Sequence, residues 1–444
     1  MKTNLRFLCA LVFACLYTQV QATNYVVINL ADSGAGSLRA ALTSANADAS
    51  ATSTSPHIIS FDIFGGGTIA LTTDLPALNN HITISGQAEQ ITIAGGTGVR
   101  GFYINAGKTV EISNLIIQGA NLTSSFGGGI HNEGDLTLLN CTVKSNTISG
   151  TGQGGGISNS GTGTLTLSNC TVSGNTSSNT GGGIVSYGTL NIVNSTIADN
   201  AGNDGGGIMS YSDLIMINCT VTNNNGGGIY FITGSSADIG LLNTISVGSV
   251  TGTDLYTDAA YSVISANCLY GTKTASATLT GSNNITGSTK AAVFGTNVLA
   301  NNGGSTQTMA LIAGSPAVDA GTTGTGVPTL DQAGQSRSGA VDIGSFEYQP
   351  TATANFTKLS QDLVTIYSNP GNGLFEIEIG AAIQGVYDWK VIDMKGKLLQ
   401  SSGNIQKVNG SDMQSINLSG QAQGTYLLII TTEKGIVNKS LVKL

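Results

Sequence analysis

The chain has 444 residues, of which 9% are charged and 62 are Gly, and its formal net charge is -8. Disordered chains combine high charge with low hydrophobicity, so this composition excludes that class and indicates a folded protein with a weakly charged, hydrogen-bonding surface. Residues 23–349 contain 7 Lys and Arg against 18 Asp and Glu, which argues against nucleic acid or an anionic membrane surface as the partner.

Residues 1–22 predict a secretory signal peptide. Lys2 and Arg6 precede an apolar run over 7–17, and the segment ends at the small residue Ala22. The run is shorter than the roughly 20 apolar residues of a membrane span. Cys15 leaves a lipoprotein signal open, although Phe13 fits that pattern poorly. No later segment is long and apolar enough to cross a bilayer, so we expect an exported protein without a membrane span.

A helix and a first strand are the next predicted elements. Ser37 is a favourable N-cap for a short amphipathic helix over 37–43, and a strand-like run follows at 58–64. Because a solenoid must cover its open ends, we expect this helix to cap the domain that follows it.

A repeat of about 25 residues dominates the middle of the chain. Gly-Gly-Gly-Ile recurs at intervals of 21 to 27 residues and ends at Ile130, Ile157, Ile184, Ile208 and Ile229. A second block of the type Asn-Cys-Thr-Val begins at Asn140, Asn169, Asn194 and Asn218. Leucine-rich repeats of similar length carry a helix and a fixed Leu/Asn pattern that is missing here. Short strands separated by Gly and Asn turns instead predict an all-β protein whose body is a parallel β-helix.

The alignment of the repeats predicts columns of buried side chains, because strands alternate inward and outward with a period of two. The columns are Leu136, Leu165, Leu190 and Leu214; Leu138, Leu167, Ile192 and Met216; Val143, Val172, Ile197 and Val221; and the Ile residues of the Gly-Gly-Gly-Ile blocks. The Asn that opens each second block is expected at a bend, where it tolerates a left-handed conformation and can stack its amide into a ladder. Its Asn-x-Thr form also matches a glycosylation sequon, which the repeat itself explains.

Four cysteines remain once the signal peptide is removed: Cys141, Cys170, Cys219 and Cys268. An even number in an exported protein is compatible with disulfides. Parallel strands in register place these side chains next to one another about 4.8 Å apart rather than pointing at each other, which favours stacked, reduced thiols. Metal binding there would require nearby ligands such as the histidines His57, His81 and His131, and we expect no metal.

The repeat becomes irregular over 234–306, and residues 301–349, here called the closing segment, are expected to close the domain. Asp319, Asp331 and Asp342 of this segment could gather around Ca²⁺, but hydrogen bonding at turns and caps is the simpler interpretation. We therefore expect no cofactor, with structural calcium as the open alternative.

Three features together resemble the choice-of-anchor β-helix proteins of bacterial surfaces. They are the run at residues 31–41, the Gly-Gly-Gly-Ile repeats, and residues 314–321 followed by 331–332 and 342–347. The repeats are also similar to those of polymorphic outer-membrane proteins. The resemblance covers most of residues 23–349 and implies a right-handed, pectate-lyase-like β-helix on an exported protein, without implying an activity.

Residues 363–444 form a second region of different composition, with 7 of the 17 Lys and Arg and the only tryptophan, Trp389. Short alternating strands with Gly turns predict a small immunoglobulin-like β-sandwich there. Residues 350–362, which are polar and contain Thr and Ala, are the expected linker.

Motifs in this second region resemble the type A sorting domain of the type IX secretion system. The matching positions include Asn369, Pro370, Gly373, Gly396, Gly424 and Tyr426, whereas Ser368 stands where that family usually has Pro. The resemblance implies export by the type IX secretion machinery, cleavage of the domain, and attachment to surface lipopolysaccharide. It places the protein outside the cell or on the outer surface of a Gram-negative bacterium.

Cationic residues suitable for catalysis are scarce in the repeat region. Parallel β-helices often act on polysaccharides, and a lyase of this kind needs a cationic base near Ca²⁺-binding carboxylates. Between Arg100 and Arg337 there is no arginine, and Lys144 is the sole lysine between Lys108 and Lys273.

Carboxylate pairs are equally scarce, although a glycosidase needs two carboxylates roughly 5 to 9.5 Å apart. Asp135 and Asp213 share a column three coils apart, which is roughly 14 Å at the strand spacing. Glu133 with Asp135, and Asp199 with Asp204, are the remaining candidate pairs, for which a solvated face is the simpler interpretation. The sequence thus predicts no catalytic residue.

Tyr187 and Tyr211 occupy the same position of successive repeats and should stack one coil apart. Exposed aromatic rings beside rows of Asn and Thr are suited to sugar faces, so the pair is a candidate glycan-binding site. A packing ladder at a turn is the alternative interpretation.

We therefore expect a secreted or surface-anchored, non-enzymatic adhesin or glycan-binding scaffold, with a polysaccharide or host-surface ligand. Two alternatives are a polysaccharide lyase or glycoside hydrolase of the same superfold and a purely structural surface-layer component.

Overall fold

The computed structural model describes residues 22–86, 90–232, 237–258, 261–337, 339–349, 357–358, 360–393, 397–407, 410–432 and 435–444. The expected signal peptide lies outside this part of the chain except for its last residue, Ala22. The chain divides into two compact units, Met1–Tyr348 and Gln349–Leu444.

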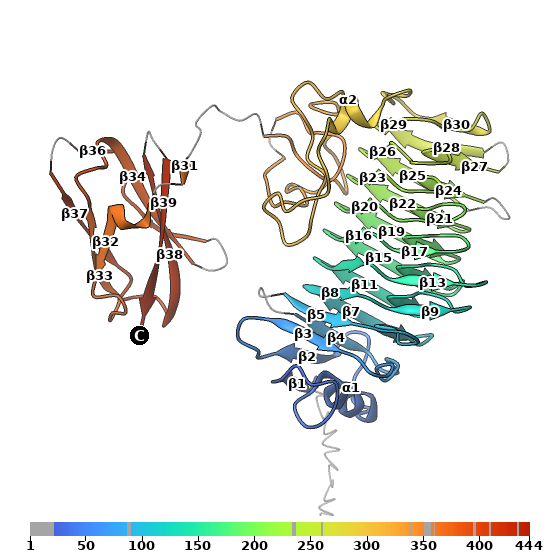
Figure 1. Ribbon diagram of the computed structural model, residues 1–444, viewed down its shortest axis with the longest axis horizontal. Helices are drawn as coiled ribbons and strands as arrows, with labels where there is room; N and C mark the ends of the chain where they lie inside the picture. Colours follow the sequence, from blue (N-terminus) through green and yellow to red (C-terminus); the bar gives the residue numbers. More distant parts are fainter. Residues whose placement is uncertain are drawn as a thin grey trace, which may run out of the picture. The chain divides into compact units, whose positions relative to one another are not determined.

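The N-terminal unit is a parallel β-helix, in which the strands of successive coils stack on one another (Figure 1). The coils pair in register as the repeat predicts, because Leu136 of one coil is level with Leu165 of the next, and Leu165 with Leu190. The expectation of an all-β solenoid is therefore confirmed.

Four parallel sheets run along this unit. The 11-stranded sheet contains, in spatial order, β1 (Asn24–Val27), β2 (His57–Phe61), β4 (Ile82–Ser85), β7 (Thr109–Ser113), β11 (Asp135–Leu139), β15 (Thr164–Ser168), β19 (Thr189–Val193), β22 (Leu214–Ile217), β25 (Ile239–Leu242), β28 (Tyr261–Ala266) and β30 (Ala277–Thr280). The 9-stranded sheet contains β3 (Gly67–Ala70), β5 (Ile91–Ala94), β8 (Leu115–Gln118), β12 (Thr142–Lys144), β16 (Thr171–Ser173), β20 (Thr196–Ala198), β23 (Thr220–Thr222), β26 (Ile245–Val247) and β29 (Leu269–Tyr270). The 7-stranded sheet contains β6 (Phe102–Ile104), β10 (Ile130–Asn132), β14 (Ile157–Asn159), β18 (Ile184–Ser186), β21 (Ile208–Ser210), β24 (Ile229–Phe231) and β27 (Leu255–Thr257). The 3-stranded sheet contains β9 (Asn121–Thr123), β13 (Thr147–Ser149) and β17 (Thr176–Ser177).

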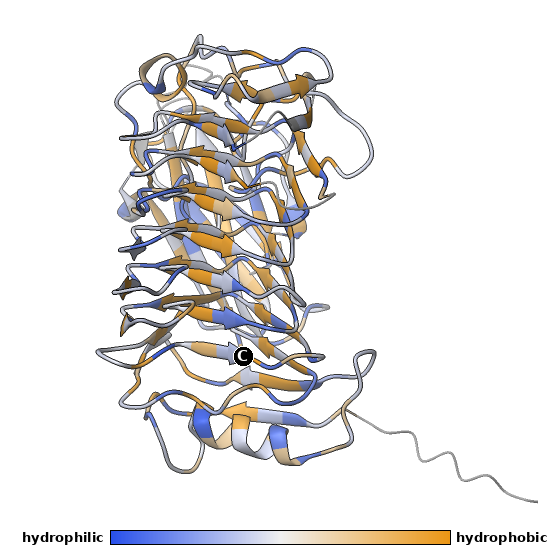
Figure 2. Ribbon diagram, turned by 90° about the vertical axis from the view of Figure 1, so that its right-hand side faces the viewer, coloured by the Kyte–Doolittle hydropathy of each residue, from blue (hydrophilic) through white to orange (hydrophobic). Residues whose placement is uncertain are grey.

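The predicted apolar columns fill the space between the sheets. The columns that begin at Leu136, Leu138, Val143 and Ile130 are buried along their whole length and belong to one continuous core. Apolar residues recur at the same place in successive coils (Figure 2). Burial of one aliphatic side chain contributes roughly 1.5 to 3 kcal/mol, so columns of this length account for the cohesion of coils that are unstable alone.

The helix α1 (Leu38–Ala47) packs on the first coils. Ser37 is its N-cap, and the Ser37 side chain accepts a hydrogen bond from the amide of Ala40. Leu38 and Leu42 are fully buried in the common core. The predicted helix is present and extends to Ala47. The expectation that the first strand follows the helix is wrong, because β1 precedes the helix and pairs in parallel with β2.

The Asn residues that open the second blocks lie at the bend between the 11-stranded and 9-stranded sheets. Their backbone is left-handed as predicted, with φ angles of 52°, 53°, 48° and 51° at Asn140, Asn169, Asn194 and Asn218. The continuous buried amide ladder is instead built by a different set of residues. Each side-chain amide donates to the side-chain carbonyl of the next at 3.0 Å along Asn146, Asn175, Asn200 and Asn224.

The Gly-Gly-Gly segments pack against this buried ladder. A Cβ on Gly156 would lie 2.6 Å from the carbonyl oxygen of Gly183 and 2.9 Å from the amide nitrogen of Asn175. A Cβ on Gly182 would lie 2.3 Å from the carbonyl oxygen of Ala201. The repeat therefore requires glycine because the neighbouring backbone leaves no room for a side chain.

The closing segment does not lie across the end of the β-helix, where β30 and α2 (Lys290–Phe294) are found. It returns along the outer face of the 9-stranded sheet (Figure 1). Its carbonyl oxygens accept hydrogen bonds from side chains of distant coils, at Ser305 from Gln90 and at Ala320 from Asn267. The segment thus lies along many coils.

All four described cysteines are buried free thiols, as the register of the repeat favours. Each thiol contacts backbone carbonyl oxygens, as in Cys170, whose Sγ lies 3.3 Å from the Leu138 oxygen and 3.2 Å from the Ser168 oxygen. Burial raises the pKa of Cys141 to about 12. The cysteine side chains therefore pack in the core and do not form a reactive site.

The C-terminal unit contains two sheets that are antiparallel apart from the short β31/β39 pair. The first contains β31 (Thr357–Lys358), β39 (Gly435–Lys443), β38 (Gly424–Thr432), β34 (Gly385–Ile392), β35 (Leu398–Ser401) and β36 (Ile405–Lys407), and the second contains β32 (Val364–Tyr367), β33 (Leu374–Ile379) and β37 (Asp412–Asn417). A 3-10 turn, η1, spans Gln361–Leu363. Phe375 of one sheet and Trp389 of the other share one buried core, as in the expected sandwich. β31 and the first two residues of η1 fall within the residues expected as linker.

Candidate functional site

Tyr187 and Tyr211 lie at the turn between the 7-stranded and 11-stranded sheets. Their rings stack with centroids 4.6 Å apart and an interplanar angle of 2°. Tyr187 is 36% exposed, and its hydroxyl donates a hydrogen bond to Gln153 Oε1. The two residues therefore do stack one coil apart, while their role in glycan binding stays a prediction.

The two tyrosines belong to a column whose other members are not aromatic. The backbone amides of its members donate to the preceding coil in the same way, and the members are Glu133, Ser160, Tyr187, Tyr211 and Ile232. Tyr211 covers one face of the Tyr187 ring, whereas the small side chain of Ser160 follows on the other side. At about 4.8 Å per coil, Tyr187 and Glu133 are roughly 10 Å apart along the column. We call the Ser160 position of the column, between Glu133 and Tyr187, the Ser160 notch, because its side chain is the smallest of the three.

His131 lies beside Glu133 at the edge of the notch. Its Nε2 is 3.3 Å from Glu133 Oε1, and its ring centroid is 5.0 Å from that of Tyr103. Burial lowers the pKa of His131, the Arg100 guanidinium lowers it further, and Glu133 opposes both effects. His131 Nε2 is engaged with Glu133 and His131 Nδ1 is buried, so the Glu133 carboxylate is the group at this edge that can accept a hydrogen bond from a hydroxylated ligand.

Arg100 fixes the loop next to this edge. Its Nε donates to the Gly127 carbonyl oxygen at 2.8 Å, and its Nη2 donates to Ser125 Oγ at 2.7 Å and the Phe126 carbonyl oxygen at 2.9 Å. Its guanidinium carbon lies 5.7 Å from the centroid of the Tyr103 ring. These contacts hold Phe126 in place and commit the guanidinium to structure.

Further aromatic side chains extend this surface along the 7-stranded sheet. Tyr230 and Tyr256 stack with centroids 4.6 Å apart and pack against Val185 and Met209. We call the surface formed by Tyr103, Phe126, His131, Tyr187, Tyr211, Tyr230 and Tyr256 the aromatic face. Sequence reasoning identified only the Tyr187/Tyr211 pair. A signal was available for Tyr103, His131, Tyr230 and Tyr256, because each follows a buried apolar residue of a strand and must therefore point outward.

The Thr residues of the second blocks do not lie beside the tyrosines, whereas Thr164 and Thr189 begin the strands that follow the Ser160 and Tyr187 turns. Thr171 and Thr196 of the second blocks are fully buried beneath the closing segment. Thr171 Oγ1 donates to the Gln307 carbonyl oxygen at 2.6 Å, and Thr196 Oγ1 donates to Gln332 Oε1 at 2.7 Å.

The residues considered for catalysis are distributed over different faces. Lys144 is on the outer face of the 9-stranded sheet. It pairs with Ser173 of the next coil, and Ser173 pairs with Ala198 of the coil after that. Asp199, which follows Ala198, therefore lies two coils away from Lys144. Asp199 Oδ1 accepts a hydrogen bond from Asn223 at 2.5 Å. Asp204 lies in the loop before β21.

The two candidate carboxylates of one coil also diverge. Glu133 contacts His131 on the aromatic face. Asp135 begins β11 on the 11-stranded sheet and is exposed between Thr109 and Thr164 of the adjacent coils. These two side chains do not form one site.

The carboxylates of the closing segment accept backbone hydrogen bonds. Asp331 accepts from the amides of Gln335 and Glu347, both at 2.7 Å, and Asp342 accepts from the amide of Asp319 at 2.7 Å. In the part of the chain that the structure describes, no group of three or more His, Cys, Asp or Glu is placed to hold a metal ion. These geometries are those of turn and cap bonds.

Two of the sorting-motif positions hold the end of the last strand, β39. Asn369 Nδ2 donates to the Ser440 carbonyl oxygen at 2.7 Å, and Asn369 Oδ1 accepts from the amide of Val442 at 2.8 Å. Gly373 has a φ of 98°, and a Cβ there would lie 2.9 Å from Lys443 Cε. Pro370 lies between them.

The other sorting-motif positions lie at β38 or outside the described residues. Gly424 begins β38, and Tyr426 is buried with its hydroxyl donating to the Ala422 carbonyl oxygen at 2.5 Å. Gly396 is outside the described residues. Ser368 has a φ of 62°, which a proline ring cannot adopt, so the departure from the family pattern accompanies a different local backbone.

Two family models match the chain. Residues 129–305 match the right handed beta helix region, and residues 365–443 match the secretion system C-terminal sorting domain. No curated protein is significantly similar in sequence. Among solved structures, the chain is similar to pectate lyase Pel9A, at 14% identity and a TM-score of 0.41, over 74% of this chain and 98% of that chain.

The chain thus combines a right-handed parallel β-helix with a type IX sorting domain. It is secreted to the outer surface or surroundings of a Gram-negative bacterium, and the sorting domain implies interaction with the secretion machinery. Within the described ranges, no helix is long and apolar enough to span a membrane.

Proposed function

We propose that this exported β-helix is a non-enzymatic adhesin or glycan-binding scaffold that holds a sugar ring in the Ser160 notch. The main observation in support is the parallel stack of Tyr187 on Tyr211, whose ring centroids lie 4.6 Å apart. The stack fixes the Tyr187 ring before a ligand arrives, which reduces the ordering cost of binding. The ring face directed toward Ser160 is a platform for the apolar face of a pyranose.

The polar groups around the notch support the same proposal. Glu133 and His131 stand at one edge, and Gln153 stands beside the Tyr187 hydroxyl. A carboxylate accepts hydrogen bonds from sugar hydroxyls and an amide both donates and accepts, and bonds to the charged carboxylate are the stronger ones. The negative charge of Glu133 disfavours an anionic sugar at this position.

The placement of the charged residues favours binding over catalysis. Lys144 and the Asp199/Asp204 pair do not converge on the notch, and Arg100 is committed to the loop of Phe126. The alternative is a polysaccharide lyase or hydrolase. Product release from a uronate polymer that is abolished by Lys144→Ala or Asp199→Asn would establish that alternative.

A glycan array tests the binding function with residues 23–444, the chain after the expected signal peptide, called the secreted chain below. Binding of a glycan by the parent is expected to weaken at least about tenfold in Tyr187→Ala, the loss typical of a central contact residue. Phe64→Ala, which removes a 99% exposed aromatic side chain outside the aromatic face, is the matched control. Binding to no glycan, or equal binding by parent and Tyr187→Ala, contradicts the proposal.

We further propose, from the sorting-domain resemblance, that the C-terminal domain is removed during export and that the β-helix is attached to surface lipopolysaccharide. Cleavage is expected between residues 349 and 363. Mass spectrometry of the surface form should recover peptides up to the closing segment and none from β33 onward. Recovery of β38 peptides at equal abundance would contradict cleavage, and release by a lipopolysaccharide-deficient strain would support attachment.

A further inference from the structure

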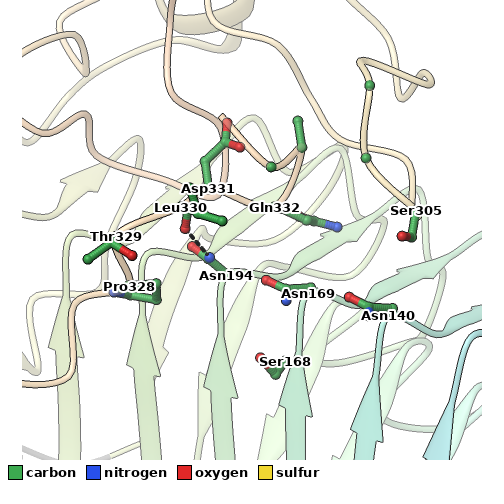
Figure 3. Close-up of a pocket in the computed structure, with 14 residues that line it drawn as sticks. Asn140, Ser168, Asn169, Asn194, Ser305, Pro328, Thr329, Leu330, Asp331 and Gln332 are labelled. Atoms are coloured by element: carbon green, nitrogen blue, oxygen red, sulfur yellow. Dashed lines mark hydrogen bonds between the residues drawn. The ribbon is translucent and has the colours of Figure 1, made fainter. Parts of the chain in front are cut away.

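We infer that a second site, independent of the Ser160 notch, binds an uncharged oligosaccharide between the closing segment and the bends of the β-helix (Figure 3). The space has a volume of about 750 Å³. Its polar lining comes from both sides and includes Asn140, Ser168, Asn169, Ser305, Thr329 and Gln332. We call this space the amide groove.

The asparagine side chains at the bends differ in whether they bond to the closing segment. Asn194, Asn243 and Asn267 donate to backbone carbonyl oxygens of the closing segment at 2.6, 2.8 and 3.0 Å. Asn140 and Asn169 hold the same position in the two coils before Asn194, where the groove opens (Figure 3). Among the residues that the structure describes, their half-buried side-chain amides have no hydrogen-bond partner. Asn114, at the same bend one coil before Asn140, donates to the Gly86 carbonyl oxygen at 3.4 Å, and Asn218 Nδ2 is buried. Asn140 and Asn169 are thus two neighbouring, half-buried amides of the column that a ligand can satisfy.

The two amides are preorganised. Asn140 and Asn169 share the left-handed backbone of the column, with φ angles of 52° and 53°, and lie one coil apart, which is about 4.8 Å. Each amide is both a donor and an acceptor, and the hydroxyls of Ser168, Ser305 and Thr329 are both as well. Such a row matches a chain that carries hydroxyl groups at regular intervals.

The electrostatics of the groove select an uncharged chain. Asp331 is the one charged residue among those that line it in the described structure, and both of its carboxylate oxygens accept backbone hydrogen bonds within the closing segment. The lining contains no Lys or Arg to pair with a uronate. An anionic sugar would lose hydration without gaining an ion pair, so it is disfavoured.

The composition of the lining favours a saccharide over an extended peptide. Peptide grooves combine main-chain hydrogen bonds with apolar pockets for alternate side chains. The apolar lining here consists of Pro328, Leu330 and Ala333, and Leu330 is 51% exposed at the rim. The groove thus has the amides for a hydroxylated chain and lacks the pockets for side chains.

Titration calorimetry of the secreted chain with cellohexaose, mannohexaose and xylohexaose tests the inference, with hexagalacturonate and pentaglycine as comparison ligands. The double variant Asn140→Gly/Asn169→Gly removes both amides and tolerates the left-handed backbone, so it keeps the fold. Asn283→Gly, which alters an exposed left-handed asparagine outside the groove, is the matched control.

We expect at least one neutral hexasaccharide to bind the parent, the Asn283→Gly control and the Tyr187→Ala variant alike, and to bind the double variant at least tenfold more weakly. Hexagalacturonate should not bind at the groove. Equal binding of the neutral sugar by parent and double variant overturns the inference, as does binding of none of the three sugars or tighter binding of pentaglycine. Loss of glycan binding in Tyr187→Ala alone would support the notch and count against the groove.

Discussion

Asn175 donates a hydrogen bond from its side-chain amide to the side-chain carbonyl oxygen of Asn200, one coil away, at 3.0 Å. The same oxygen accepts the backbone amide of Asn175 at 3.0 Å, and the Asn175 amide also donates to the Val143 carbonyl oxygen at 2.9 Å. Both side chains are fully buried. Each rung of this ladder therefore satisfies polar groups of three coils at once.

Removing one rung should destabilise the β-helix. Asn200→Ala leaves the Asn175 amide and backbone N–H without their acceptor in a buried position, which costs about 1 to 3 kcal/mol. Urea unfolding followed by circular dichroism should show a lower midpoint. Asn203→Ala, at an exposed position in the same region, should leave the midpoint nearly unchanged. Equal midpoints for the two variants would mean that the ladder contributes little.

The triple-glycine segments should tolerate no Cβ at their central position. Gly182→Ala places a methyl group 2.3 Å from the Ala201 carbonyl oxygen, so the coils must move apart, and overpacking of this kind costs about 1 to 3 kcal/mol. Gly161→Ala is the control, because a Cβ there meets its nearest neighbour, the Tyr187 oxygen, at 3.8 Å. Thermal unfolding should separate the two variants, with Gly182→Ala melting several degrees lower. A melting temperature equal to that of Gly161→Ala would show that the coils adjust freely.

The cysteine column should be inert in the folded protein. Burial raises the pKa values of Cys141 and Cys219 to about 12, so the reactive thiolate is scarce at pH 8. Iodoacetamide should modify none of the four described cysteines of the native secreted chain and all of them in denaturant, as read by peptide mapping. Recovery of a disulfide-linked peptide would contradict the stacked-thiol arrangement.

The register of the repeat explains how much of this fold and site the sequence could predict. Once Ile157 is aligned with Ile184, every residue of those coils acquires a known neighbour, which is why the buried columns, the left-handed bends and the Tyr187/Tyr211 stack all followed from spacing. The function of that stack does not follow from register, since spacing places a ring but does not name its ligand.

The features that the sequence could not predict either lie outside the repeat or belong to repeat positions that resemble ordinary solvated residues. The closing segment has no period, so nothing local indicated that Gln332 would contact Thr196 across the outer face of the 9-stranded sheet. Asn175 stands in a polar loop and resembles a solvated turn residue until the fold buries it. His131 and Tyr103 reach the aromatic face from successive coils whose intervening sequence differs.

The closing segment should be more stably packed on the β-helix at acidic pH. Burial raises the pKa of Glu347 to about 7, although the hydrogen bond from the Asp342 amide lowers it. The charge of the Asp342 carboxylate raises this pKa, and Arg337, whose Nη1 lies 3.0 Å from Glu347 Oε2, lowers it. A carboxyl group whose folded pKa is raised contributes stability that is complete below its unfolded pKa, about 4.3, and is lost as pH rises through the folded value. The stability of the segment should therefore fall between about pH 4.3 and pH 7.

Glu347→Gln isolates this titration, because the amide keeps an acceptor for Arg337 without an ionisable group. Hydrogen exchange of closing-segment peptides should show that protection falls more steeply with pH in the parent than in the variant. Comparison of the two at each pH removes the intrinsic pH dependence of exchange. A parent segment that becomes more protected than the variant as pH rises would contradict the assigned direction.

The last strand of the sorting domain should depend on Asn369. Its side chain accepts from the Val442 amide and donates to the Ser440 carbonyl oxygen, so one residue satisfies two backbone groups at the end of β39. Asn369→Ala removes both bonds, at about 0.5 to 1.5 kcal/mol each, and should release the final residues before the sandwich core unfolds. Hydrogen exchange of the C-terminal peptide should accelerate while peptides of β34, which carry Trp389, keep their protection. Asn404→Ala, at an exposed position of the same unit, is the control, and equal exchange in the two variants would mean that strand pairing alone holds β39 in place.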